Sequence, residues 1–332
     1  MASYQYVIAN TYAAGQNAYL GDFRDSYMDD TAWWAPARID AYDLTGNTAY
    51  LTTAEDDASY LAGYWDSTCG GGIWWSSART YKNAIANELY LYLNAALHNR
   101  ISGDTTYLAR AMAEESWFLH SGMINGQNPI NDGLTINSGG TCANNGAAVW
   151  TYNQGVILSG LTELYKATGD ASVLNEAVQL AGASTSSPQL NPVSATAPKG
   201  ELADPSASGA DEPTFKGVYV RGVSALNSVA SGAPYGCYRR GRRRRPTSTT
   251  ATPPTSTATC GPVRGRVPRR AARTSLRPRS KEAPSSFRTP DRVSPRPVRP
   301  RSPARSTAEE AQATVVATRV STNPAMMTAT RA

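Results

Sequence analysis

Apolar positions recur with a helical period over much of the first 236 residues. In the segment NAIANELYLYLNAALHNRI, the apolar side chains that share one face are Ile85, Leu89, Tyr92, Leu93 and Leu97. A spacing of three and four residues is typical of an amphipathic α-helix, and we count about eight such helices. No alternation of apolar and polar residues, the mark of a β-strand, competes with this pattern. The sequence therefore predicts an all-α protein.

A short turn motif separates three pairs of these helices. Each copy has Thr or Ser, then Gly, then Asn or Asp, and a Leu four residues later: AYDLTGNTAYL, HNRISGDTTYL and ELYKATGDASVL, with glycines at Gly46, Gly103 and Gly169. Glycine ends a helix in the left-handed conformation, and Asn or Asp caps the next helix through its side-chain oxygen. The motif therefore predicts antiparallel helical hairpins. The glycines lie about 60 residues apart, which fits one hairpin and one long connection per repeat.

Long loops rich in Gly, Asn and Trp connect the hairpins, at 67–81, 123–152 and roughly 184–214. Long loops in a compact domain are usually functional. Each precedes the first helix of a hairpin, and these inner helices are expected near residues 30–44, 81–101, 152–167 and 214–229. If the inner helices share one orientation, the loops gather on one face with Trp74, Trp75, Trp150 and Tyr152. Such rings suit stacking on sugar faces; the alternative is that they pack the loops.

Charge divides the chain into two unlike segments. Residues 1–236 hold 10 Lys and Arg against 22 Asp and Glu, a net charge of −12, whereas residues 237–332 hold 22 against 4, a net charge of +18. All seven Trp lie in the first segment. The second segment combines low hydrophobicity with high net charge, which predicts disorder. We therefore expect a folded domain over 1–236 and a disordered Arg/Pro/Ser/Thr-rich tail over 237–332.

The tail has three interpretations. Its basic residues are almost all Arg, and Arg beside Pro, Ala, Thr and Ser is also what a GC-rich gene yields when it is read in the wrong frame. The second interpretation is a generic disordered tail, and the third is a selected nucleic-acid-binding segment. Polycationic Arg would bind phosphate non-specifically in each case, so no specific nucleic-acid partner is predicted.

The cysteines and the N-terminus bear on the compartment. None of the four cysteines has the CxxC spacing of a zinc site. Cys69 and Cys142 lie in loops of the folded part and could form one disulfide, which would suit a secreted protein. The N-terminal MASYQYVIANTYAAGQNAYL lacks the charged start and apolar run of a signal peptide. No stretch reaches membrane-spanning length.

Two adjacent carboxylates, Asp29 and Asp30, precede a pair of tryptophans in YMDDTAWWA. One interpretation is that an aspartate caps the following helix. The other is a sugar-cleaving pair, because retaining glycosidases need two carboxyl groups about 5–5.5 Å apart, and at a loop-to-helix junction both can point the same way. Repulsion within the pair would raise one pKa, and burial against Trp33 or Trp34 would raise it further.

Other chemistries find little support. Both histidines lie in predicted helices and no G-x-S-x-G elbow occurs, which argues against Ser–His hydrolysis. CGGGIWW lacks the Lys-Ser/Thr end of a phosphate-binding loop. A second acidic cluster, Glu55-Asp56-Asp57, lies within a predicted helix and is expected to be a solvated face.

Four motifs follow one another along the chain: YMDDTAWWA, CGGGIWW with YKNAIANEL, WTYNQGVILSGLTELYKATGD and DEPTFKGVYVR. In this ordered set the chain resembles glycoside hydrolase family 76, the endo-α-1,6-mannanases, over about residues 3–230. The resemblance implies an (α/α)6 toroid of helical hairpins, cleavage within α-1,6-linked mannan and net retention of configuration. It implies Asp29 as nucleophile and Asp30 as general acid/base, with no metal or cofactor, and a secreted or cell-surface location.

The same segments offer candidates for binding mannan or a manno-oligosaccharide. Aromatic rings could stack on the sugar, and amides or an amine could bond its hydroxyls: Trp33, Trp34, Trp74, Trp75, Asn83, Trp150, Tyr152, Asn153, Gln154 and Lys216. Each amide could equally satisfy a helix end. The alternative for each tryptophan is packing within a loop.

The chain also departs from the family pattern. The family has a longer segment before its paired aspartates, where 28 residues stand here. Its later hairpins are replaced by the tail, so the expected toroid is incomplete. Two alternatives to hydrolysis stay open. One is a catalytically inactive mannan-binding remnant, and the other is a mannan transglycosidase in cell-wall assembly that uses the same aspartates.

Overall fold

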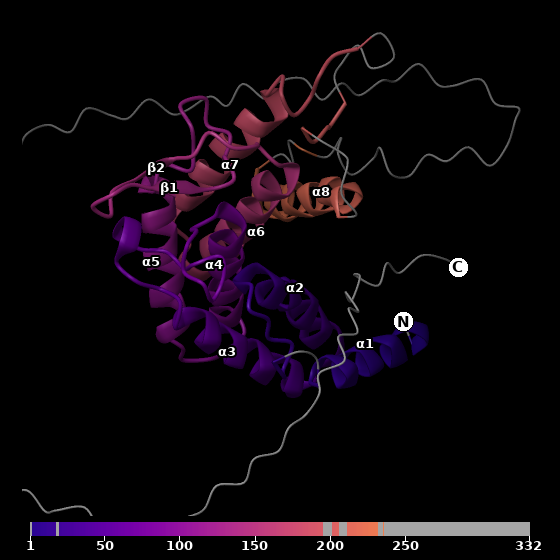
Figure 1. The fold of residues 1–332 in the computed structure, drawn as a ribbon. Coiled ribbons are helices and arrows are strands. Elements are labelled where there is room, and N and C mark those ends of the chain that lie inside the picture. Colours follow the sequence, from indigo (N-terminus) through magenta and orange to yellow (C-terminus); the bar gives the residue numbers. More distant parts are fainter. Residues whose placement is uncertain (1, 18–19, 195–200, 206–210, 232–234, 236–332) are drawn as a thin grey trace, which may run out of the picture. The chain divides into compact units, whose positions relative to one another are not determined.

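The computed structural model describes residues 2–17, 20–194, 201–205, 211–231 and 235 of the 332-residue chain. This part is built from eight α-helices (Figure 1): α1 (Ala2–Gly15), α2 (Met28–Thr45), α3 (Thr48–Ala62), α4 (Ala84–His98), α5 (Thr106–His120), α6 (Thr151–Thr168), α7 (Ala171–Ser186) and α8 (Glu212–Val229). The all-α prediction is confirmed. None of these helices has both the length and the apolar character needed to cross a bilayer. The predictions for the tail, 237–332, lie outside the described residues.

The three predicted turns join α2 to α3, α4 to α5 and α6 to α7. Their glycines adopt the left-handed conformation, with φ of +69°, +76° and +66° at Gly46, Gly103 and Gly169. The side chain that follows each glycine accepts hydrogen bonds from backbone N–H groups of the next helix: Asn47, Asp104 and Asp170. Gly46 and Gly169 end α2 and α6, as the motif predicts. Helix α4 instead ends at His98 with Asn99 as its C-cap, so Gly103 lies in the turn that follows.

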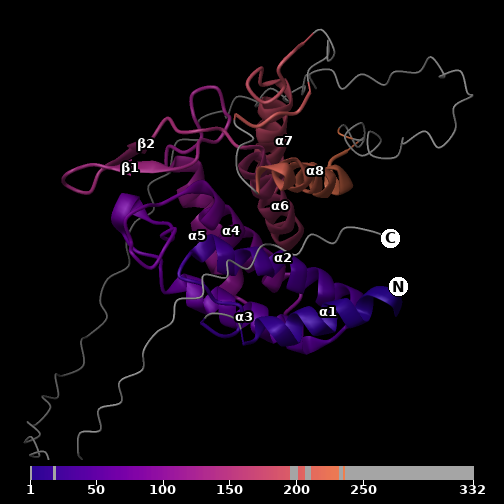
Figure 2. The same cartoon turned by 45° about the vertical axis from the view of Figure 1, so that its right-hand side comes forward.

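The first helices of the hairpins pack against one another in series. Helix α4 contacts α2 and α6, and α6 contacts α8, whereas α3, α5 and α7 pack on their own hairpin partners (Figures 1 and 2). Thirteen of the 15 residues of α4 are buried, against four of the 15 in α5. A helix buried on all sides belongs inside, whereas one with a single buried stripe covers it. The predicted inner helices are confirmed as α2, α4, α6 and α8.

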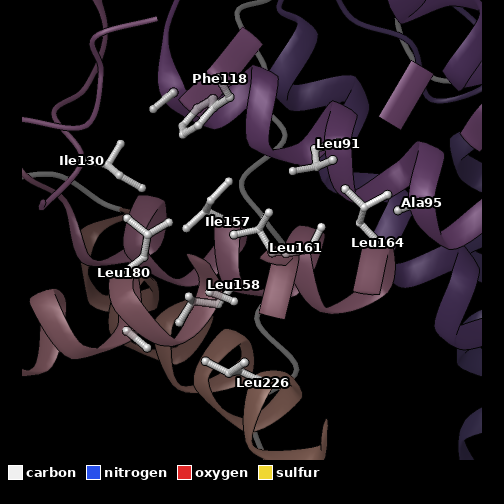
Figure 3. Packing of buried hydrophobic residues seen from close by; sticks show 14 of the residues in the cluster. Leu91, Ala95, Phe118, Ile130, Ile157, Leu158, Leu161, Leu164, Leu180 and Leu226 are labelled. Atoms are coloured by element: carbon white, nitrogen blue, oxygen red, sulfur yellow. The ribbon is translucent and has the colours of Figure 1, made fainter. Parts of the chain in front are cut away.

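Two hydrophobic clusters hold these helices together. One extends over the five helices from α4 through α8. In this cluster, the side chains that Figure 3 labels between the helices include Leu91, Phe118, Ile157, Leu161 and Leu226. The other joins α2, α3 and α4. Helices α6 and α8 approach most closely at Gly155 and Gly222, where a Cβ on Gly222 would lie 1.8 Å from the Gly155 carbonyl oxygen. Only glycine permits this approach.

The loop between α5 and α6 contains a small antiparallel pair, β1 (Leu134–Ile136) and β2 (Cys142–Asn144). The sequence shows no strand-like alternation at this place, because strands of three residues are too short to produce one. Cys142 forms the predicted disulfide with Cys69, which lies in the loop between α3 and α4, with a Cα–Cα distance of 5.2 Å. The disulfide joins the two loops that precede α4 and α6.

The second acidic cluster is not a solvated face throughout. Asp56 is exposed, but Asp57 is fully buried and forms an ion pair with Arg38 of α2. The Arg38 guanidinium also lies 4.1 Å from the centre of the Phe23 ring. The prediction for Asp57 is therefore wrong, because its place on α3 turns it inward toward α2 while its neighbour points outward.

Removing one partner of a buried ion pair leaves an uncompensated charge in the core. We expect Asp57→Ala to lower the free energy of unfolding by about 3–5 kcal/mol, measured by urea denaturation. The matched control is Asp56→Ala, one residue away and exposed, which should change stability by less than about 0.5 kcal/mol. Equal effects of the two substitutions would contradict a structural role for the Arg38–Asp57 pair.

Candidate active site

Three long loops bond the first turns of the inner helices. The N–H of Met28, which opens α2, donates to the carbonyl oxygen of Trp75 at 2.7 Å. The N–H of Ala84, which opens α4, donates to the carbonyl oxygen of Asp132, also at 2.7 Å. The N–H that opens α6 donates to Asp204 Oδ1 at 2.7 Å. The loops therefore lie at the N-terminal ends of the inner helices, and their predicted gathering is confirmed.

Asp29 and Asp30 lie in the first turn of α2, after Tyr27 as the N-cap residue. Tyr27 has extended backbone angles (φ −102°, ψ 126°), and no side chain caps the helix. The interpretation of either aspartate as the N-cap is therefore wrong. Asp29 is half-buried, and its Oδ1 has no hydrogen-bond partner among the described residues, whereas Asp30 is exposed. A buried carboxyl oxygen without a protein partner is costly and typical of a functional site.

The two carboxyl groups titrate differently. Burial, and then the charge of Asp30, raise the pKa of Asp29 to about 7, although a hydrogen bond from the Trp75 side chain opposes this. Asp30 is exposed as a residue, but desolvation of its carboxyl group by the surrounding protein, and then the charges of Asp25 and Asp211, also raise its pKa. The predicted effect of burial and repulsion is thus present. The tryptophan that bonds Asp29 comes from the loop before α4 rather than from the pair that follows it in α2.

Half-buried aromatic rings surround Tyr152 at the N-terminal end of α6. Trp150 lies parallel to it (centroids 6.4 Å apart, 11° between planes), Phe215 of α8 meets it edge-on at 4.4 Å, and Trp33 of α2 meets it at 6.5 Å. Burial first, and then nearby carboxylates that include Asp29, raise the pKa of Tyr152. This Tyr152 cluster therefore lies near the paired aspartates. Sequence reasoning identified three of its rings and missed Phe215.

A hydrogen-bonded group beside the cluster also escaped prediction. The Tyr81 hydroxyl donates to Asp132 Oδ2 at 2.6 Å and accepts from Asn145 Nδ2 at 2.8 Å. The Tyr152 hydroxyl donates to the other oxygen of Asp132 at 3.5 Å. Tyr81 is the first residue of the YKNAIANEL motif, and Asp132 lies in the second long loop. These two positions were the sequence features from which a role in the site could have been predicted. Asp132 is therefore a third carboxylate near the paired aspartates, and its two oxygens accept from the hydroxyls of Tyr81 and Tyr152.

Several predicted substrate contacts are instead internal supports. Trp74 is 5% exposed and its indole N–H donates to Asp66 Oδ2 at 2.7 Å. Asn83 is 4% exposed and caps α4 by accepting from its first turn. Gln154 is 3% exposed and bonds both the N–H and the carbonyl of Ile130. These three predictions are corrected, because the polar groups already have protein partners and the side chains are covered.

The remaining candidates stay predictions. Asn153 is fully buried and its amide atoms have no partner among the described residues, so it lies below the surface of the site. Trp34 contacts Phe23 edge-on at 4.7 Å. Lys216 is exposed on α8, one residue after Phe215 of the Tyr152 cluster. Trp75 packs between two tyrosines, of which Tyr27 lies 4.8 Å away.

The sequence profile of glycosyl hydrolase family 76 matches residues 2–237. The chain therefore belongs to this family. Among curated proteins, the mannan endo-1,6-alpha-mannosidase DCW1 of Candida albicans is 31% identical over 166 residues, which is 46% of this chain and 36% of the relative. The DFG5 mannan endo-1,6-alpha-mannosidase of Saccharomyces cerevisiae is 33% identical over 131 residues, 37% of this chain and 28% of the relative. The chain thus spans about a third of these relatives.

Solved structures agree on the fold. The Lin0763 protein of Listeria innocua superposes with a TM-score of 0.60 at 28% identity, covering 70% of this chain and 64% of that one. An inactive variant of the α-1,6-mannanase GH76A of Salegentibacter sp. HEL1_6, in complex with α-1,6-mannotetrose, gives 0.56 at 22% identity, covering 64% and 60%. Family 76 structures are (α/α)6 toroids, so the predicted fold class is confirmed.

The raised pKa of Asp29 has a consequence for stability. A carboxyl group whose pKa is about 7 in the folded chain and 3.8 without its surroundings binds its proton more tightly when folded. Folding is then most favourable below about pH 4 with respect to this group, and the benefit is lost as pH rises through about 7. Asn at this position cannot ionise and escapes that penalty.

We therefore expect Asp29→Asn to raise the free energy of unfolding at pH 8 by about 1–4 kcal/mol, with a much smaller effect at pH 4.5. Urea denaturation at the two pH values measures this. Asp56→Asn, at an exposed position, serves as the control and should show no such pH dependence. A gain from Asp29→Asn that is the same at both pH values would contradict the shifted pKa.

Proposed function

We propose that the chain cleaves α-1,6-mannosidic linkages within mannan, with retention of configuration, through Asp29 and Asp30. The observation that carries this proposal is the first turn of α2: two consecutive carboxyl groups, one half-buried and titrating near neutral pH, beside the Tyr152 cluster. A retaining reaction needs one ionised carboxylate and one carboxylic acid at the same pH. Adjacent groups that repel each other's charge supply this pair.

In the proposed reaction the Asp29 carboxylate attacks the anomeric carbon while Asp30 donates its proton to the departing glycosidic oxygen. Asp30 then takes a proton from water, and that water displaces Asp29 from the anomeric carbon. In the chain without substrate, the pKa values favour a proton on Asp29. This assignment therefore requires that bound sugar shift the shared proton to Asp30, which lies on the more exposed side.

The names of related proteins support the substrate. Curated relatives are described as mannan endo-1,6-alpha-mannosidases. In the Salegentibacter mannanase, a variant with two consecutive aspartates replaced is described as inactive and binds α-1,6-mannotetrose. We infer that the corresponding ligand here is α-1,6-mannan or an oligosaccharide of it, with Trp33, Trp150 and Tyr152 as stacking surfaces. The Cys69–Cys142 disulfide supports an oxidising, secreted or cell-surface location.

A reducing-end assay with α-1,6-mannan tests the proposal. We expect new reducing ends from the wild-type chain, and a loss of at least about 100-fold in kcat for Asp29→Asn and for Asp30→Asn, because each removes a group that acts on the reacting atoms. The exposed Asp56→Asn variant should retain activity. Calorimetry with a manno-oligosaccharide measures binding independently of cleavage, and so separates a mannan-binding remnant from an enzyme.

Binding with no turnover in the wild-type chain would contradict hydrolysis and support a mannan-binding remnant. Products longer than the substrate, formed in place of new reducing ends, would support transglycosylation through the same aspartates. If the wild-type chain shows no binding and no turnover, the proposed substrate is overturned.

A further inference from the structure

The side chain of Lys82 is fully buried, and its ammonium group is surrounded by oxygen atoms. Lys82 Nζ donates to the carbonyl oxygens of Thr68 (2.8 Å), Gly71 (2.7 Å), Gly72 (2.9 Å) and Asp66 (3.3 Å), and to Asp66 Oδ1 (2.9 Å). All five partners are acceptors, so the amine must carry its three hydrogens and its charge. The loop between α3 and α4 is therefore wrapped around a cation that belongs to the chain itself.

The backbone of this loop is bent to make that arrangement possible. Four consecutive residues have φ in the left-handed range, at 59°, 79°, 151° and 80° for Cys69, Gly70, Gly71 and Gly72. A Cβ on Gly72 would lie 2.2 Å from the ring of Trp117, and the Trp117 indole N–H donates to the carbonyl oxygen of Cys69 at 2.9 Å. Glycines are needed in this segment because its carbonyl groups must turn toward Lys82 while the Trp117 indole packs against the backbone.

The same loop leads directly to the paired aspartates. Ile73 exchanges two hydrogen bonds with the buried side chain of Asn87 (2.7 and 3.1 Å), and Trp74 is tied to the Asp66 carboxylate. The next residue, Trp75, accepts a hydrogen bond from the N–H of Met28, one residue before Asp29, and the Trp75 side chain acts to lower the pKa of Asp29. Only Ile73 and Trp74 therefore separate Gly72, whose carbonyl oxygen accepts from Lys82, from Trp75 at the start of α2.

Lys82 also connects to Asp132, the third carboxylate of the site. Its own carbonyl oxygen accepts from the N–H of Leu134 at 3.0 Å, in the loop that carries Asp132. The residue before it, Tyr81, holds the Asp132 side chain through its hydroxyl group. One short segment at the start of α4 therefore fixes the loop that bonds Asp29 and the loop that presents Asp132.

We propose that Lys82 is a positioning residue of the active site: its buried ammonium organises the 66–75 loop and thereby holds Trp75 against Asp29. The inference rests on the proposed function for the role of Asp29, but the placement of Trp75 can be measured without activity. The charged groups that act on Lys82 are Asp66, Glu114 and Arg79.

The test is an NMR titration of the full chain labelled with 13C at the aspartate carboxyl groups. The Asp29 signal is assigned by its loss in Asp29→Asn. In the wild type it should titrate near pH 7. In Lys82→Met the loop loses its central cation, water reaches Asp29, and the midpoint should fall by at least one pH unit, because burial is the main cause of the raised pKa. Asp30 and Tyr152 also act on this group and are unchanged in the variant.

Two further variants and one control variant sharpen the comparison. Asp66→Asn replaces the carboxylate that pairs with Lys82 by an amide of the same size. It should shift the Asp29 midpoint in the same direction as Lys82→Met but by less, and it takes the place of Lys82→Met if that variant does not fold. Trp75→Phe keeps an aromatic ring but removes the indole N–H that acts to lower the pKa of Asp29, so it should raise the midpoint. Leu91→Ala, a core truncation in α4 and away from the loop, should leave the midpoint unchanged.

If the wild type cleaves mannan, Lys82→Met should lower kcat at least tenfold while changing KM less than twofold. If it does not cleave mannan, the proposed function fails and the titration still decides the role of Lys82. An unchanged Asp29 midpoint in Asp66→Asn and in folded Lys82→Met would overturn the inference. A shift of equal size in Leu91→Ala would also overturn it, because the effect would then reflect general loosening of the fold.

Discussion

The N–H groups in the first turn of each inner helix need acceptors that the helix itself cannot supply. In this protein the long loops provide them, through the carbonyl oxygens of Trp75 and Asp132 and the side chain of Asp204. This requirement places irregular segments at the N-terminal ends of α2, α4 and α6. It also places Trp75 beside the start of α2, where Asp29 is half-buried and Asp30 is exposed. The geometry of the site thus follows from how the helices begin.

The site carries an electrostatic cost that the rest of the fold must offset. Asp29 is held half-buried, no cationic side chain of the described residues pairs with it, and Asp30 adds repulsion. Deeper in the domain, Glu88 of α4 and Glu114 of α5 are fully buried, and burial raises the pKa of each well above its usual value. Buried carboxyl groups of this kind stabilise no structure by themselves, and they lie in the elements that support the site.

Local signals determined much of the fold. Gly46, Gly103 and Gly169, each followed by Asn or Asp, were enough to locate three hairpins, because helix ending and helix capping depend on neighbouring residues alone. The disulfide was predictable because Cys69 and Cys142 were the two cysteines within the part expected to fold. The paired aspartates were found from a junction between loop and helix.

Non-local contacts explain what could not be predicted. Trp74 and Trp75 are adjacent, and only packing against Asp66 and Lys82 decides that the first is an internal support and the second meets Asp29. Tyr81 and Asp132 meet although they are 51 positions apart.

The measurement that tests the central claim most directly is the anomeric configuration of the first product, followed by proton NMR during cleavage of a soluble α-1,6-manno-oligosaccharide. A retaining reaction needs its two carboxyl groups about 5–5.5 Å apart, whereas an inverting reaction needs them about 6.5–9.5 Å apart so that a water fits between them and the sugar. The account predicts that the α-anomer forms first and that the β-anomer appears only later, through mutarotation. Initial release of the β-anomer would contradict a reaction carried by Asp29 and Asp30 as a retaining pair.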